Sequence, residues 1–142
     1  MPATITLKPI EANLRHNTDT FTKMNPYCVF VVDNQRFSGQ VCKKGGKHPH
    51  WNDAVTIPNS NNEKILVEVM DKDLITPDDH IGSFMMDVQE IKLQGRNSRW
   101  YALSYKNKPA GEILIEFTFH PDREIAEEKV VESGTFSINS VK

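Results

Sequence analysis

The chain has 142 residues, of which 38% are hydrophobic and 25% are charged, and its formal net charge is -2 at pH 7. This length suits one domain with a hydrophobic core, and the nearly balanced charge excludes a nucleic-acid-binding surface spread over the whole molecule. Cys28 and Cys42 are too few for a disulfide framework, and no apolar run is long enough for a signal peptide or a membrane-spanning helix. We therefore expect a soluble protein in a reducing, cytoplasmic compartment.

Short runs of alternating hydrophobic and polar residues, rich in β-branched and aromatic side chains, follow one another along the chain. The pattern predicts an all-β fold, an antiparallel sandwich of eight strands. A tight turn is expected at 33–35 and one helical turn between Asp87 and Leu93. The expected strands are Thr4–Ile10, Tyr27–Val32, Arg36–Cys42, Asp53–Ile57, Lys64–Met70, Gly82–Met86, Arg99–Leu103 and Gly111–Phe119.

The last of these strands predicts where the core lies and where the domain ends. Ile113, Ile115, Phe117 and Phe119 share one face of an extended chain, which we expect to be buried. Beyond Pro121 the sequence becomes charged and then small and polar. Residues 1–121 are therefore expected to form the domain and residues 122–142 a charged tail, in which a helix over 123–131 would be too short to be stable alone.

Acidic residues gather where strands are expected to end. In Asp71-Lys72-Asp73 the alternate carboxylates leave the same side of an extended chain, and Asp78 and Asp79 follow closely. Crowded carboxylates repel one another at neutral pH unless a cation relieves them, and calcium prefers oxygen ligands from flexible loops. The spacing is not that of an EF-hand, which needs a 12-residue loop with a central Gly. A plain preference of Asp for turns explains the composition but not the spacing.

Five segments, in this order and spacing, resemble the C2 domain family from about Thr4 to Pro121. They are Asp19 with Asn25-Pro26-Tyr27, Pro49-His50-Trp51-Asn52, Asp71-Lys72-Asp73 with Asp79-His80-Ile81-Gly82, Trp100-Tyr101-Ala102-Leu103, and Gly111-Glu112-Ile113. The resemblance implies a Greek-key β-sandwich. The first expected strand precedes the Asp19 loop and the last is Gly111–Phe119, an arrangement similar to the type II topology of the family. The chain most resembles small, free-standing C2 proteins such as those of plants.

The resemblance also implies a site for one or two Ca²⁺ ions. Asn25 departs from the family pattern, which has Asp there, so we expect weaker calcium binding, with Asp78 as a partial replacement for the missing charge. The alternative is that Asn25 caps the Asn-Pro-Tyr turn and has no metal role. The implied ligands are the side chains of Asp19, Asn25, Asp71, Asp73 and Asp79, with the backbone carbonyls of Met24 and Lys72.

Two further groups of residues suggest contact with a membrane. Phe21, Met24, Leu74 and Ile75 are apolar where loop tips are ordinarily polar, so they are expected to enter the lipid interface or, alternatively, to pack against neighbouring loops. Lys43, Lys44 and Lys47 form a basic cluster, which is either an anionic-lipid site or a solvated turn.

The sequence thus predicts a calcium-dependent phospholipid-binding module in signalling or membrane trafficking, cytoplasmic and recruited to anionic membranes as a peripheral protein. No nucleophile motif or phosphate-binding glycine loop indicates an enzyme, and His48 and His50 lack the further ligands of a zinc site. Trp51 and Trp100 are expected to be core residues. The alternative function is a calcium-independent protein interaction scaffold with degenerate calcium loops, which would recruit a partner through the tail or a β surface.

Overall fold

The computed structural model describes residues 2–18, 22–59 and 63–122, so the expected tail from residue 123 onward, with its helix, lies outside these ranges. All eight expected strands are present, and the short helix is confirmed at α1 (Val88–Gln94). Among the described residues, no helix has the length and hydropathy needed to cross a bilayer. The strands are β1 (Thr4–Leu14), β2 (Pro26–Val32), β3 (Gln35–Ser38), β4 (Val55–Pro58), β5 (Lys64–Asp71), β6 (Asp79–Asp87), β7 (Arg96–Tyr105) and β8 (Lys108–His120).

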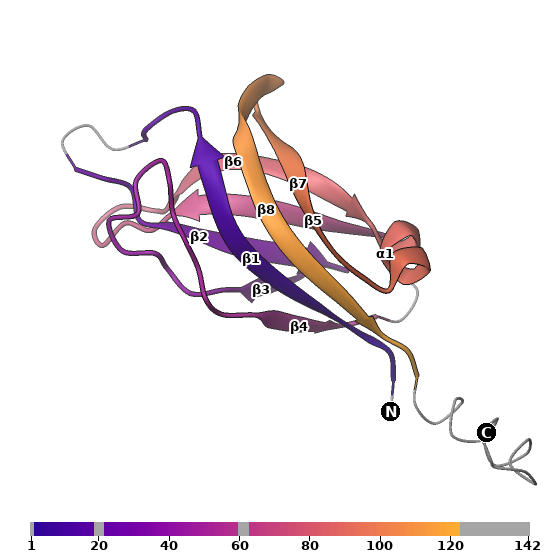
Figure 1. Cartoon of the computed structure of the whole chain (residues 1–142). Coiled ribbons are helices and arrows are strands. Elements are labelled where there is room, and N and C mark those ends of the chain that lie inside the picture. Colours follow the sequence, from indigo (N-terminus) through magenta and orange to yellow (C-terminus); the bar gives the residue numbers. More distant parts are fainter. Residues whose placement is uncertain (1, 19–21, 60–62, 123–142) are drawn as a thin grey trace, which may run out of the picture.

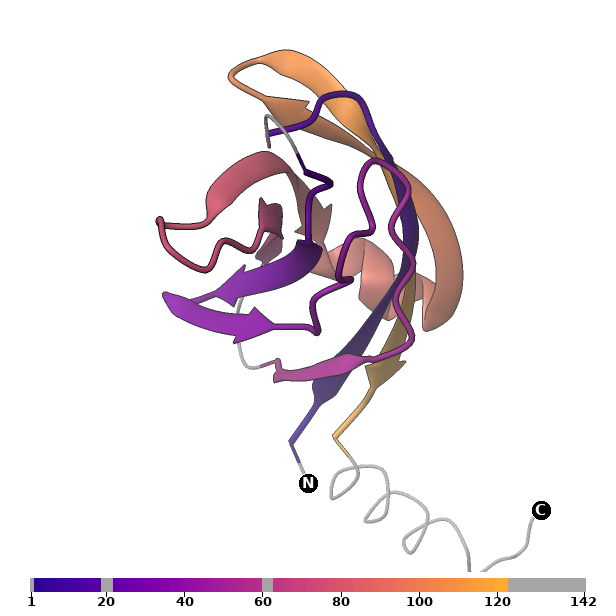
Figure 2. The same cartoon turned by 90° about the vertical axis from the view of Figure 1, so that its left-hand side faces the viewer.

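The strands pair antiparallel in the order β3-β2-β5-β6-β7-β8-β1-β4. A single residue pair, Ser83 with Ser104, joins β6 to β7, so the sheet divides there into two four-stranded halves. Viewed from the end, the halves curve around a common interior (Figure 2). The predicted antiparallel β-sandwich is confirmed, whereas the type II assignment stays a prediction.

A tight turn connects the neighbouring strands β2 and β3. Val32 pairs with Gln35, so Asp33 and Asn34 alone form this turn, with φ angles of 48° and 67°. Two successive positive φ angles are typical of the type I′ turn, which matches the twist of a hairpin and which Asn and Asp tolerate. The turn expected at 33–35 is therefore confirmed.

The core lies between the two halves and follows the alternation of the strands. Ile113, Ile115 and Phe117 of β8 are buried as expected, and Phe119 is partly buried against the same core. Trp51 is also buried, and its indole N–H donates to the carbonyl of Pro26 at 3.1 Å. The expectation for Trp100 is wrong: its side chain is 45% exposed.

The third strand is shorter than predicted because the chain turns away from its partner after Ser38. Gly39 N–H still donates to the Cys28 carbonyl at 2.9 Å, but the next N–H, from Gln40, donates to the carboxylate of Asp53 at 2.9 Å. A side chain at Gly39 would meet that same carboxylate at 3.2 Å, tighter than ordinary contact. We call the connection between β3 and β4, residues 39–54, the lysine loop.

Three connections meet at one end of the sandwich, opposite the start of β1 and the end of β8 (Figure 1). They are the β1–β2 connection, the lysine loop and the β5–β6 connection. Backbone hydrogen bonds tie them together, since Lys72 N–H donates to the Asn25 carbonyl and Gly46 N–H to the Met24 carbonyl, each at 3.0 Å. This loop end carries the residues that the sequence singles out.

Candidate metal centre

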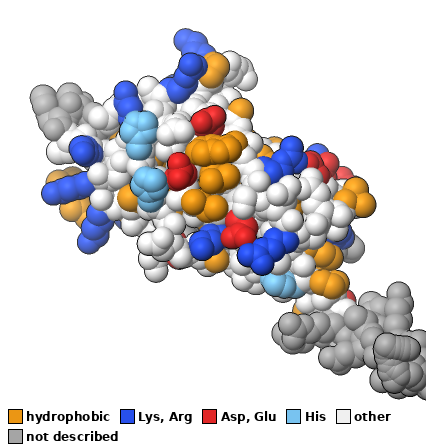
Figure 3. All heavy atoms as spheres, viewed as in Figure 1, with side chains coloured by type: hydrophobic (Ala, Val, Ile, Leu, Met, Phe, Trp, Pro, Cys, Tyr) orange, Lys and Arg blue, Asp and Glu red, His pale blue; other side chains and the backbone are white. Residues whose placement is uncertain are grey.

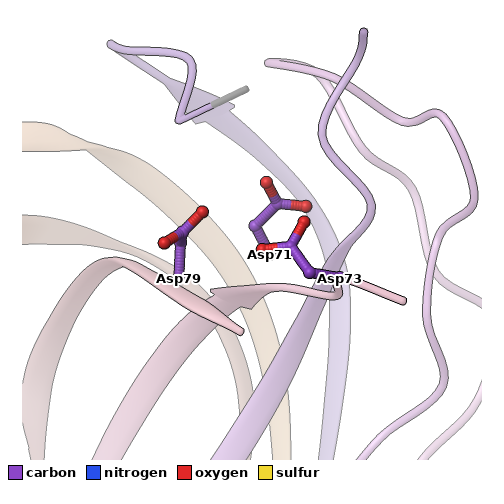
Figure 4. Close-up of side chains that lie close together, drawn as sticks. All are labelled: Asp71, Asp73 and Asp79. Atoms are coloured by element: carbon purple, nitrogen blue, oxygen red, sulfur yellow. The ribbon is translucent and has the colours of Figure 1, made fainter. Parts of the chain in front are cut away.

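Three carboxylates converge at the loop end. Asp71 closes β5, Asp73 follows it, and Asp79 opens β6, so the antiparallel pairing of these strands brings the three together. One carboxylate oxygen from each lies within 4.8 Å of the others, and Figure 4 shows the side chains around one shared space. Since Ca²⁺ lies about 2.3 to 2.6 Å from its oxygen ligands, two ligands of one ion can be about 5 Å apart. The separation therefore fits a calcium ion.

Asp71 is the fixed member of this acidic cluster. Its side chain is fully buried, and its carboxylate accepts the Asn25 N–H at 2.7 Å and the Thr18 hydroxyl at 2.6 Å. A buried carboxylate needs such donors, because unpaired charge away from water is costly. The sequence reasoning missed Thr18, which has no motif of its own and is recognisable only as the neighbour of Asp19.

The crowding of carboxylates in the cluster shows in the pKa of Asp73. Its partial burial, together with the nearby negative charges of Asp71 and Asp79, raises the pKa of its carboxyl above the usual value. A raised carboxyl pKa means that the ionised form is disfavoured by its surroundings. A bound cation would relieve this repulsion.

Asp78 supports the loop and does not join the cluster. Its carboxylate accepts the Asp73 N–H at 2.9 Å and the Tyr27 hydroxyl at 2.5 Å, and these two bonds lower the pKa of Asp78. Burial, with added effects from the hydrogen bond and charge of Asp78, raises the pKa of Tyr27 to about 12. The structure therefore gives Asp78 a role in loop shape, and the proposal that it replaces the charge missing at Asn25 finds no support here.

Asn25 lies beside the cluster, but its side chain bonds to the protein on both sides. The amide oxygen accepts the Lys44 N–H at 2.9 Å, and the amide nitrogen donates to the Lys72 carbonyl at 3.4 Å. The carbonyls of Lys72 and Met24, both expected as ligands, thus accept hydrogen bonds from within the protein. Neither side-chain partner lies in the Asn25-Pro26-Tyr27 turn, so both the ligand role and the capping of that turn stay predictions.

The membrane contact expected for Met24 is wrong in this structure. Its side chain is fully buried in the core: Met24 lies two residues before β2 and continues the inward alternation of Pro26, Cys28 and Phe30. This alternation was readable in the sequence by extending the strand pattern back by two residues. Asp19 and Phe21 lie outside the described residues.

The other expected surface residues are exposed. Leu74 and Ile75, between Asp73 and Asp78, have exposed fractions of 99% and 97%, which argues against their packing on neighbouring loops. Lys43, Lys44 and Lys47 lie on the lysine loop, and all three are exposed. Figure 3 shows Lys and Arg side chains gathered around the loop end on one face of the molecule. Apolar tips and positive charge therefore flank the acidic cluster.

Comparison with known proteins gives one consistent result. A sequence model of the C2 domain matches residues 3–103. The chain is 28% identical over 120 residues to "Elicitor-responsive protein 3" of Oryza sativa subsp. japonica, covering 80% of this chain and 83% of the rice protein.

Solved structures show the same likeness. A "C2 domain-containing protein from putative elicitor-responsive gene" has a TM-score of 0.72 at 22% identity, covering 85% of this chain and 91% of that one. A calcium-bound structure of two C2 domains of extended synaptotagmin 2 gives a TM-score of 0.70 at 23% identity, covering 93% of this chain and 52% of that one. At these identities the likeness concerns the fold.

Proposed function

The chain belongs to the C2 domain family, and we propose that it is a calcium-dependent phospholipid-binding module in signalling or membrane trafficking. The observation that carries the proposal is the placement of Leu74 and Ile75, almost wholly exposed, in the same connection as the acidic cluster. Apolar loop tips beside a cation site fit a surface that meets a membrane. In a cell this would be a cytoplasmic protein recruited to membranes as a peripheral protein.

The residues proposed to hold the cation are Asp71, Asp73 and Asp79, with Asp19 as a further candidate from the family pattern. Calcium, as one or two ions, would supply positive charge and coordination positions for a lipid phosphate. In its absence the three carboxylates repel anionic lipid and one another. The protein's own contribution is to hold Asp71 rigidly through Thr18 and Asn25 while Asp73 and Asp79 stay accessible.

Replacing Asp73 and Asp79 together by Asn tests the cation site. A ligand that binds only the folded state stabilises it by RT ln(1 + [L]/Kd), about 2.7 kcal/mol when calcium is one hundredfold above Kd. We expect calcium to raise the unfolding temperature of the natural protein and to leave that of the double variant unchanged.

The matched control for this test is Asp33→Asn. Asp33 lies in the β2–β3 turn at the other end of the sandwich, and Asn tolerates its φ of 48°. The control variant should retain the whole calcium response. An equal response in the Asp73/Asp79 variant would remove the cluster from the proposal, and no response in the natural protein would contradict calcium binding itself.

A calcium-independent protein interaction scaffold is the second candidate function. Trp100 is exposed and pairs with Leu114 on the outer face of β7 and β8, and hydrophobic side chains occupy the middle of the face seen in Figure 3. The tail from residue 122 could recruit a partner as well. Binding to anionic vesicles that is equal in calcium and in chelator would favour this candidate, and a chain ending at residue 122 would tell whether the tail is needed.

A further inference from the structure

Asn25 uses all four of its polar groups within the loop end. Its N–H donates to Asp71 at 2.7 Å, and its carbonyl accepts the Lys72 N–H at 3.0 Å. Its side chain accepts the Lys44 N–H at 2.9 Å and donates to the Lys72 carbonyl at 3.4 Å. Asn25 therefore joins Asp71 and Lys72, which we call the acidic segment, to Lys44 of the lysine loop.

The bond to Lys44 acts at a strained point of the lysine loop. Lys44 has a φ of 57°, in the left-handed region that is unfavourable for a residue with a side chain. Gly46 follows with a φ of 63°, and its N–H is held by the Met24 carbonyl at 3.0 Å. Residues 24 and 25 thus hold both left-handed positions of the turn that carries Lys43, Lys44 and Lys47.

An amide suits this position better than a carboxylate. A carboxylate could accept the Lys44 N–H, but it could not donate to the Lys72 carbonyl, and it would add negative charge beside Asp71. The departure from the family pattern at Asn25 is therefore matched by contacts that need both a donor and an acceptor.

We propose that Asn25 is a positioning residue that fixes the lysine loop against the acidic segment, and that its side chain is not a cation ligand. The three lysines are then held in place at the loop end even when no metal is bound. The part of this inference that concerns lipid rests on the proposed function, whereas the part that concerns the loop does not.

Amide hydrogen exchange, measured by NMR in chelator, tests the positioning directly. In Asn25→Ala, exchange at the Lys44 amide should rise by roughly five- to tenfold, the effect of losing one hydrogen bond. Asn25→Asp should keep the Lys44 amide protected, because a carboxylate oxygen replaces the amide oxygen as acceptor. The Gly39 amide, bonded to the Cys28 carbonyl, is the internal reference and should be unchanged in both variants.

Two results would overturn the positioning role. Unchanged exchange at Lys44 in Asn25→Ala would show that the bond does not hold the loop. An equal rise at Lys44 and Gly39 would show a general loss of stability and no specific action on the lysine loop.

Vesicle binding tests whether Asn25 acts through the lysines. With vesicles of phosphatidylcholine and phosphatidylserine in calcium, Asn25→Ala should weaken binding of the natural protein severalfold. In a background with Lys43, Lys44 and Lys47 all changed to Ala, the same substitution should have no further effect, because residues that act as a unit are not additive. Additive losses of vesicle binding would contradict the proposal that Asn25 acts through the lysines. If the natural protein does not bind these vesicles at all, the proposed function is contradicted, but the hydrogen-exchange test of Asn25 is unaffected.

Calcium titration by calorimetry tests the second half of the proposal. If Asn25 is not a ligand, Asn25→Ala should leave calcium affinity within about twofold of the natural protein, because the substitution removes no oxygen ligand and adds no charge. A tenfold or greater loss of calcium affinity in Asn25→Ala, equivalent to about 1.4 kcal/mol, would place the Asn25 side chain among the ligands and overturn this half.

Discussion

At the scale of single residues, Tyr27 and Asp78 show how the shape of the β5–β6 connection depends on a side chain from another strand. The Tyr27 hydroxyl, on β2, reaches across to the carboxylate that also caps the Asp73 N–H. The motif residue Tyr27 is thus part of the support for the cluster, a role that the sequence pattern did not reveal. Asp78 follows the acidic residues in sequence, but in the structure its carboxylate bonds to Tyr27 and Asp73 and supports the loop.

Tyr27→Phe should lower the free energy of unfolding by about 1 kcal/mol at pH 7, because the Asp78 carboxylate loses one donor. The effect should depend on pH. The folded pKa of Tyr27, about 12, lies above the ordinary tyrosine value of 10.0, so the folded state binds more protons between these values. Stability from this hydroxyl is therefore complete below about pH 10 and is lost as the pH rises toward about 12.

Urea unfolding of both proteins from about pH 7 to about pH 12 checks this prediction. The difference between the natural protein and Tyr27→Phe should stay constant to about pH 10 and shrink above it. Equal stability at neutral pH, or convergence while the pH is still well below the tyrosine range, would show that the hydrogen bond does not stabilise the loop.

At the scale of elements, α1 shows a local sequence signal that the fold uses without change. Asp87 has extended backbone angles and its carboxylate accepts the Gln89 N–H at 3.0 Å, while Gly95 ends the helix at a φ of 76°. An Asp at the N-cap and a Gly at the C-cap satisfy backbone groups that a helix leaves unpaired. This seven-residue helix could therefore be placed from sequence because its signals are local.

Asp87→Ala should lower the free energy of unfolding by about 1 kcal/mol, because the Gln89 N–H loses its acceptor. Asp87→Asn should retain most of the stability, since Asn is an equally good N-cap. Urea denaturation of the three proteins measures both effects. Equal destabilisation by Ala and Asn would mean that the ion pair with Lys64, 3.7 Å away, matters more than the cap.

At the scale of the whole molecule, exposed apolar side chains lie at both ends. Leu74 and Ile75 are exposed at the loop end, and Leu93, 79% exposed, lies on α1 near the opposite end. If the loop end meets the membrane, only the first pair should contribute to lipid binding. Leu93 then provides a matched control of similar size and exposure.

Changing Leu74 and Ile75 together to Ser should weaken binding to anionic vesicles in calcium by about tenfold or more, because burying an aliphatic side chain contributes about 1.5–3 kcal/mol. Leu93→Ser should bind as the natural protein does. The unfolding temperature should hardly change in either variant, since these side chains are largely exposed to solvent. A comparable loss in Leu93→Ser would indicate that binding does not depend on the orientation proposed here.

The sequence by itself determined the eight strands, the short helix, the inward face of β8 and the family. These features follow from alternation, caps and motif spacing, all of which are local along the chain. It also predicted Asp71, Asp73 and Asp79 as a group, and the structure brings them together, because a strand end and the next strand start must meet when the two pair antiparallel.

Only the tertiary structure decided what the remaining residues at the loop end do. The hydrogen bond from Tyr27 to Asp78 and the bond between Asn25 and the lysine loop join segments far apart in sequence. A side chain with both donor and acceptor groups can bond to many partners. The neighbouring sequence does not show which of them it meets in the fold. Which partner it takes is decided by the packing of the strands, and for Asn25 that packing favours the lysine loop.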